Sequence, residues 1–139
     1  MLLPLPRGSS HHPVTSHLPG CQHGPTIQLV DSLRPMLEKY NATGHISGHD
    51  HCLEHVDEGR GPVYAVVGAG DECCYHNKKA HLIPKGALKF AMWNDGSGSP
   101  IEAGFGSMVA THESLTLRYH SANGTLLYQA EPVFPRTLN

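Results

Sequence analysis

Charge and long apolar runs are both scarce in this chain. Only 16% of its 139 residues are charged, the net charge is −2, and no basic run stands out. Nucleic-acid-binding domains carry clustered Lys and Arg, so we predict no nucleic acid partner. No apolar run approaches the about 20 residues that a membrane-spanning helix needs, so we predict no membrane partner either. Residues 1–7 are too short and too rich in proline to form a signal peptide within this chain.

Cysteine is also scarce, and its spacing indicates no common metal site. The four cysteines contain no CxxC pair and are Cys21, Cys52, Cys73 and Cys74. Adjacent cysteines rarely bond to each other because the required geometry strains the backbone, so a bond between Cys73 and Cys74 is not expected. Pairing of either residue with Cys21 or Cys52 stays open. A zinc site that joins Cys52 to the Cys73-Cys74-x-His76 cluster is an alternative, although this spacing matches no usual structural zinc pattern.

Histidine, by contrast, is abundant. The chain has 12 histidines against 10 lysines and arginines together. Imidazole is the commonest metal ligand and titrates near neutral pH, so the excess favours a functional site without locating it. A hydrophobic content of 39% indicates a globular chain, and the length suits a single domain. Two glycosylation sequons, at Asn41 and Asn123, favour secretion only weakly because such triplets are common by chance.

The order of predicted elements is one main helix followed by about five strands, which is an α/β chain. Residues 1–24 are expected to be irregular, and a helix is predicted from Pro25 to a stop at Asn41, with a kink or interruption at Pro35. Residues 71–86 read as a polar loop. An extended segment at 43–47 precedes strand candidates at 63–67, 87–93, 104–110, 114–119 and 126–128. The last two candidates flank Asn123-Gly124, a strong hairpin turn, so pairing toward the end is mostly antiparallel.

The segment Gly48-His49-Asp50-His51 is the strongest candidate for chemistry. In extended backbone, residues two apart face the same side, so both imidazoles are predicted to converge on one site. Gly48 is expected to allow a tight turn, and Asp50 to point away as a partner of a ligand or as a cap. Two neutral imidazoles suit a pair of metal cations. The alternative interpretation is a polar loop in a histidine-rich protein.

These histidines stand in a longer ordered pattern. The segments are, in order, Ser10-His11-His12-Pro13-Val14, His23-Gly24-Pro25-Thr26, Leu33-Arg34-Pro35-Met36-Leu37, Gly48-His49-Asp50-His51, Gly68-Ala69-Gly70 and Pro84-Lys85-Gly86-Ala87-Leu88-Lys89-Phe90. From about His11 to Tyr128 the chain closely resembles the C-terminal part of the purple, or tartrate-resistant, acid phosphatases of the calcineurin-like metallophosphoesterase superfamily. The resemblance implies that residues 1–139 are one partial domain of a metallophosphoesterase β-sandwich flanked by helices. From the sequence itself, residues 1–9 are expected to be an irregular start, and residues 132–139 a loose tail.

The resemblance also implies roles for individual residues. His11 and His49 would bind a divalent metal, His51 a ferric ion, and His23 the phosphate or the leaving group. The cofactor would be a binuclear centre of Fe(III) with a divalent iron, zinc or manganese ion. The implied reaction is hydrolysis of a phosphate monoester by metal-hydroxide attack, in a secreted, lysosomal or vacuolar acid phosphatase.

The chain also departs from the family pattern. Ser10 stands where the family has glycine, and the family's earlier motifs, which supply the metal-binding aspartates, a tyrosine and an asparagine, are absent. We therefore expect a truncated chain with an incomplete centre, and an apolar face near Val63–Val67 that is left uncovered.

Alternative interpretations of the same residues stay open. The chain could be a non-catalytic metal-binding or interaction fragment that retains only the histidine half of the site. Gly8–His12 also resembles the start of a purification tag, and His23, which precedes Gly-Pro, could simply cap the coming helix. Surface or hydrogen-bonded core positions, rather than ligand roles, are expected for His55, His112 and His120.

Overall fold

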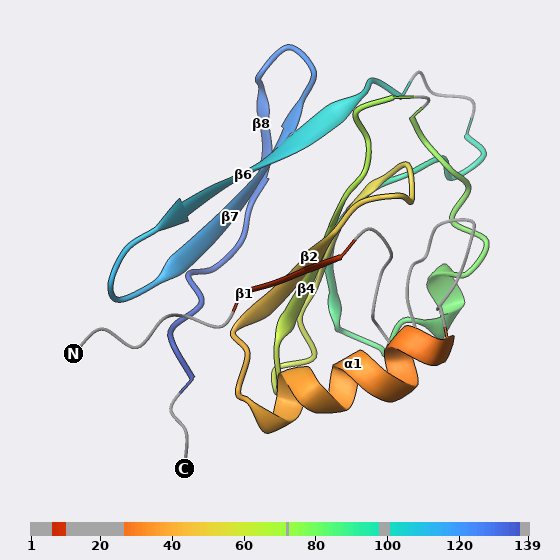
Figure 1. Ribbon diagram of the computed structural model, residues 1–139. Helices are drawn as coiled ribbons and strands as arrows, with labels where there is room; N and C mark the ends of the chain where they lie inside the picture. Colours follow the sequence, from red (N-terminus) through yellow and green to blue (C-terminus); the bar gives the residue numbers. More distant parts are fainter. Residues whose placement is uncertain (1–6, 11–26, 72, 98–100, 137–139) are drawn as a thin grey trace.

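The computed structural model describes residues 7–10, 27–71, 73–97 and 101–136, and for 7–10 and 27–29 it describes the backbone alone (Figure 1). The elements in chain order are β1 (Arg7–Ser10), α1 (Ile27–Lys39), β2 (Gly44–Ser47), β3 (Leu53–Val56), β4 (Val63–Val67), the 3₁₀ helix η1 (Ala80–Leu82), β5 (Leu88–Met92), β6 (Gly104–Ala110), β7 (Leu115–Ser121) and β8 (Leu126–Gln129). The α/β class predicted from the sequence is confirmed. No helix in this described part is long and apolar enough to cross a membrane.

The first sheet has five strands in the order β1-β2-β4-β3-β5. Strand β2 pairs in parallel with β1 and with β4, whereas β3 is antiparallel to β4 and β5. Helix α1 lies between β1 and β2 in the sequence, as parallel neighbours require a crossover connection. Leu37 of α1 packs on Val56 and Tyr64, so the helix covers one face of this sheet (Figure 1).

The second sheet is an antiparallel meander, β6-β7-β8, that packs on the other face of the first. Leu53 and Ala65 from the first sheet share a buried cluster with Leu117 and Tyr119 of β7. A glycine permits this close approach, because a Cβ on Gly106 would lie 2.5 Å from Cγ1 of Val67. The first sheet is therefore buried on both faces.

The apolar surface left uncovered is not where the sequence predicted it. Residues 63–66 of β4 are buried in the middle of the first sheet, so the expected exposed face near Val63–Val67 is wrong. Large apolar side chains are exposed on the edge strands of the second sheet instead, among them Phe105, Val109 and Leu126. A run of β-branched residues indicates a buried strand. It does not indicate which sheet of the protein has an exposed apolar face.

The predicted helix is confirmed, but it continues through Pro35 to Lys39 without an interruption. Asn41 adopts a left-handed φ of 50°, which suits the predicted helix stop.

Two strands were missed from the sequence. β1 lies in the segment predicted to be irregular, and it consists of Arg-Gly-Ser-Ser, which carries no apolar pattern. β3 follows the histidine motif directly; it is buried along its whole length and includes Glu54 and His55, so it shows no alternation.

The predicted tail is also held in place. Val133 and Leu115 exchange two backbone hydrogen bonds of 2.8 Å, and Arg136 donates to the carbonyl of Ala42 at 3.2 Å. Residues 132–136 are therefore not loose, because main-chain groups beyond β8 still find partners.

Candidate functional site

The histidine motif forms the loop between β2 and β3. Ser47 at the end of β2 pairs with Val66, and Leu53 at the start of β3 pairs with Val67, so the loop lies at the carboxyl ends of β2 and β4. In α/β sheets, ligands bind at the carboxyl ends of parallel strands. The position of the loop thus agrees with a functional site. The predicted order of helix and strands did not by itself place the loop there.

The backbone of the loop turns sharply rather than running extended. The N–H of Asp50 donates to the carbonyl of Gly48 at 2.9 Å, and the N–H of Cys52 donates to the carbonyl of Asp50 at 2.8 Å. His49 takes a left-handed φ of 69°. The prediction of extended backbone through His49 and His51 is therefore wrong, whereas the convergence of their two rings stays a prediction. The turn also falls on His49 and not on Gly48, where an added Cβ would meet nothing within 4 Å.

Gly68 explains why a glycine-rich segment follows β4. A Cβ on Gly68 would clash with the carbonyl oxygen of Asp50, and the N–H of Gly68 donates to the carbonyl of Cys52 at 3.1 Å. The absence of a side chain at Gly68 lets the histidine loop pack onto the end of β4. The first glycine of Gly68-Ala69-Gly70 is thus a packing requirement of the loop.

His51 is held by a residue that the sequence did not single out. Its ring stacks on Tyr75, with 4.5 Å between the centroids and 11° between the planes, and the N–H of Tyr75 donates to the carbonyl of His51 at 2.9 Å. Nδ1 of His51 is buried and has no hydrogen-bond partner. An unpaired buried nitrogen is costly, and it fits a position that a ligand completes. Tyr75 lies in the predicted polar loop, where no periodicity marked it.

The described residues fit one imidazole ligand of a metal but not a complete binuclear centre. His11 and His23 lie outside the described residues, so the structure does not place them relative to His51. Within the described ranges, no group of three or more His, Cys, Asp or Glu side chains could hold a metal ion. The buried Nδ1 of His51 has the chemistry of a ligand, whereas the described residues do not assemble around it the anionic oxygen donors that a ferric ion prefers.

The sulfurs of Cys73 and Cys74, which the sequence did not predict to pair, lie next to each other in this structure. The described residues do not form the alternative zinc site, since no group of three or more His, Cys, Asp or Glu side chains among them could hold a metal ion.

Three other histidines occupy the positions expected of them. Nδ1 of His55 lies 2.8 Å from the hydroxyl of Tyr119, and Nε2 of His120 lies 2.8 Å from Oγ of Ser107. His112 is exposed. Burial lowers the pKa of His55 to about 4, although nearby Asp57 raises it slightly. These surroundings match core or surface histidines rather than ligands.

A buried histidine on β2 was not singled out from the sequence. Burial lowers the pKa of His45 to about 4, and its Nε2 has no hydrogen-bond partner. His45 pairs across the sheet with Tyr64, which lies under helix α1. The available signal was its place between Thr43 and Ser47, because all three fall on the buried side of the strand.

Comparison with known proteins finds no matching protein-family model. The chain is 32% identical over 121 residues to tartrate-resistant acid phosphatase type 5 of Oryctolagus cuniculus and 31% identical over 121 residues to the same enzyme of Homo sapiens. Each alignment spans 87% of this chain and 35% of the relative. Purple acid phosphatase 7 of Arabidopsis thaliana is 30% identical over 108 residues, which are 78% of this chain and 30% of that protein. The resemblance predicted from the motifs is confirmed, and the chain spans about a third of the length of these relatives.

Proposed function

We propose that this chain forms part of the catalytic domain of a binuclear metal-dependent acid phosphatase that hydrolyses phosphate monoesters. The observation that carries the proposal is the identity of 32% to a tartrate-resistant acid phosphatase across 87% of the chain. The buried, unpartnered Nδ1 of His51 at the carboxyl end of the sheet supports it. In the proposed protein, His11, His49 and His51 serve as metal ligands and His23 contacts the substrate phosphate.

A metal pair at such a site acts as a Lewis acid toward phosphoryl oxygens. The described residues contribute by holding the ring of His51 in place. Gly68 leaves room for the loop, and Tyr75 fixes the ring of His51, so that Nδ1 is presented from a rigid sheet end. Fixing a ligand before the metal arrives reduces the entropy lost on binding.

The test is metal content and hydrolysis measured on the same samples. The full chain is loaded with iron and zinc, desalted, and analysed for metal per chain; p-nitrophenyl phosphate hydrolysis is then assayed at acid pH. We expect bound metal that His51→Ala and His49→Ala remove and that His112→Ala retains, since His112 is exposed. Equal metal content in all four proteins would contradict the proposed ligands.

A non-catalytic metal-binding or interaction fragment is the second candidate. It is favoured by the finding that no group of three potential ligands gathers within the described ranges. The two candidates differ in one outcome of the same experiment. Metal that depends on His51 without hydrolysis, in this chain and in the longest natural protein that contains it, indicates the fragment. Hydrolysis that His51→Ala abolishes in either protein indicates the phosphatase.

A further inference from the structure

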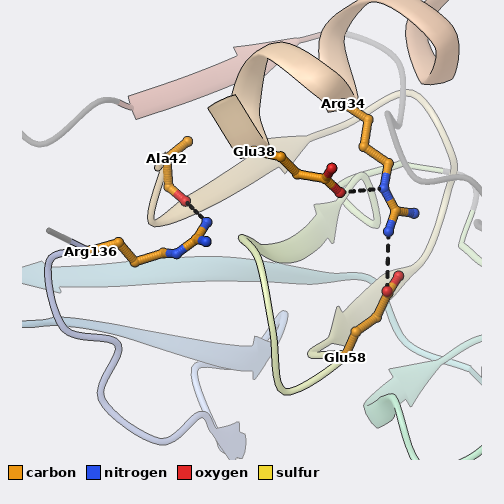
Figure 2. A network of polar contacts seen from close by, with 5 residues as sticks. All are labelled: Arg34, Glu38, Ala42, Glu58 and Arg136. Atoms are coloured by element: carbon orange, nitrogen blue, oxygen red, sulfur yellow. Dashed lines mark hydrogen bonds and ion pairs between the residues drawn. The ribbon is translucent and has the colours of Figure 1, made fainter. Parts of the chain in front are cut away.

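Arginines gather at the end of the first sheet opposite the histidine loop. Here the end of α1, the start of β2 and the last described residues meet (Figure 2). Arg34 on α1 is held between two carboxylates, with Nε 2.9 Å from Oε1 of Glu38 and a terminal nitrogen 3.1 Å from Oε2 of Glu58. Arg136 points toward the loop after α1 and donates to the carbonyl of Ala42 at 3.2 Å.

These arginines line a cavity of about 510 Å³, together with the turn before β4. The lining residues are Arg34, Glu38, Arg60, Gly61 and Arg136. Three of the five arginines in the whole chain thus surround one cavity that has a single carboxylate in its wall. This concentration is notable because the net charge of the chain is −2.

The unbalanced positive charge belongs to Arg60 and Arg136. Glu38 and Glu58 already compensate Arg34. Among the described residues, Arg60 makes no hydrogen bond or ion pair, and it is exposed on a turn between Gly59 and Gly61, both with left-handed φ. Arg136 has a neutral carbonyl as its partner, so its charge is also uncompensated.

A second cavity, of about 540 Å³, shares this wall. Its lining includes Arg60, Gly61 and Arg136, and it adds Lys89 as a further cation together with the carboxylates of Asp57 and Glu131. Arg60 and Arg136 therefore stand between two cavities. An anion bound to this pair can be reached from either side.

We propose that Arg60 and Arg136, backed by Arg34, bind a small phosphate-bearing molecule at the sheet end opposite the histidine loop. A guanidinium presents its N–H groups in a planar fork that matches phosphate oxygens, and two forks around one cavity suit a dianion. Arg34 is fixed by its two carboxylates and supplies positive potential without having to move. The site requires no metal and does not depend on the function proposed for His51.

The experiment is titration calorimetry of inorganic phosphate into the full chain in the presence of a chelator, which removes any metal-bound phosphate from the signal. We expect saturable binding that Arg60→Gln weakens by about tenfold, since a charged hydrogen bond is lost. Arg60→Lys, which keeps the charge and loses the fork, should weaken binding less. Arg136→Gln should weaken binding as Arg60→Gln does.

The controls separate this site from others. Arg118→Gln changes an arginine of the second sheet that already donates to Gln129 at 2.7 Å, so it should bind phosphate as the wild type does. His51→Ala should also be unaffected. Because Arg60 has no partner, Arg60→Gln should melt at the wild-type temperature, and it remains the deciding variant if Arg136→Gln unfolds.

Two further titrations define the ligand. Acetate that binds as tightly as phosphate would show a carboxylate site and overturn the proposed phosphate chemistry. Weaker acetate binding supports it. An absence of phosphate binding in the wild type, or equal affinity in Arg60→Gln, would overturn the site itself.

Discussion

The two sheets of this protein differ in how completely they are covered. The first sheet packs against α1 on one face and against the second sheet on the other, and its strands β3 and β4 are almost entirely buried. The second sheet buries Leu117 and Tyr119 toward the first sheet but exposes Phe105 and Leu126 on its edge strands. The histidine loop and the arginine cavity both lie at ends of the first sheet. The better-packed layer therefore supports both candidate sites, as precise placement of side chains requires.

The largest effect on the free energy of unfolding is expected when the pH is lowered. Among the described residues, two histidines have a folded pKa lowered to about 4 by burial, and both of them, His45 and His55, lie on the first sheet. Between pH 6.5 and 4 the unfolded chain binds more protons than the folded one, so stability falls as the pH falls. At pH 5 the loss is about 2 kcal/mol for each histidine, or about 4 kcal/mol together. Urea unfolding at pH 7 and pH 5 measures it.

Two variants test whether the buried histidines cause this loss of stability at low pH. His55→Gln removes one titrating group and should reduce the pH-dependent part by roughly half. His112→Gln, on the exposed loop after β6, should leave it unchanged. Equal unfolding midpoints for the wild type at the two pH values would contradict the assignment. Ligands bound to the folded chain would offset such a loss, which bears on any activity at acid pH.

Two matched leucine variants, one in each sheet, compare how much buried apolar surface each sheet contributes to stability. Leu53 on β3 is fully buried, whereas Leu126 on β8 is half exposed. Leu53→Ala should cost about 3 kcal/mol of unfolding free energy, because it removes buried surface and leaves a cavity. Leu126→Ala should cost less than about 0.5 kcal/mol. Denaturant unfolding of both variants measures the difference, and similar losses would mean that the second sheet is covered in solution.

The dependence of the histidine loop on the first sheet can be tested at two glycines. Gly68→Ala places a methyl group against the carbonyl of Asp50 and should cost about 2 kcal/mol. Gly70→Ala adds the same group where nothing lies within 4 Å, and should cost little. Thermal unfolding and zinc affinity measured on both proteins provide the readout. A Gly68→Ala protein as stable as Gly70→Ala would show that the loop does not need this contact.

The smallest effect is expected at His49. His49→Gly relieves the left-handed backbone, whereas His49→Ala keeps it, so the glycine variant should be more stable by about 1 kcal/mol. Both variants remove the imidazole, which makes the comparison independent of metal. If the alanine variant is equally stable, the backbone of this loop is not strained.

The sequence predicted the parts of the fold that carry strong local signals. Apolar spacing gave the helix, the β-branched run at 63–67 gave β4, and Asn123-Gly124 gave the final hairpin. It could not give β1 or β3, because a polar edge strand and a strand buried on both faces lack alternation. The candidate site was found through the ordered motifs, whereas its geometry depends on long-range contacts. The packing of Gly68 on Asp50 and the stacking of Tyr75 on His51 join segments whose spacing no local rule describes.

The stacking of Tyr75 on His51 also gives the site a magnetic signature. Protons above the face of an aromatic ring resonate upfield, so those of the His51 ring should be shifted, as should those of His120, which stacks on Phe105 with 4.9 Å between the centroids. With the His120 signals assigned through His120→Gln, nuclear magnetic resonance can then follow the His51 signals in unlabelled protein as metal is added. A shift of the His51 signals would report occupancy of the site before any catalytic assay is attempted.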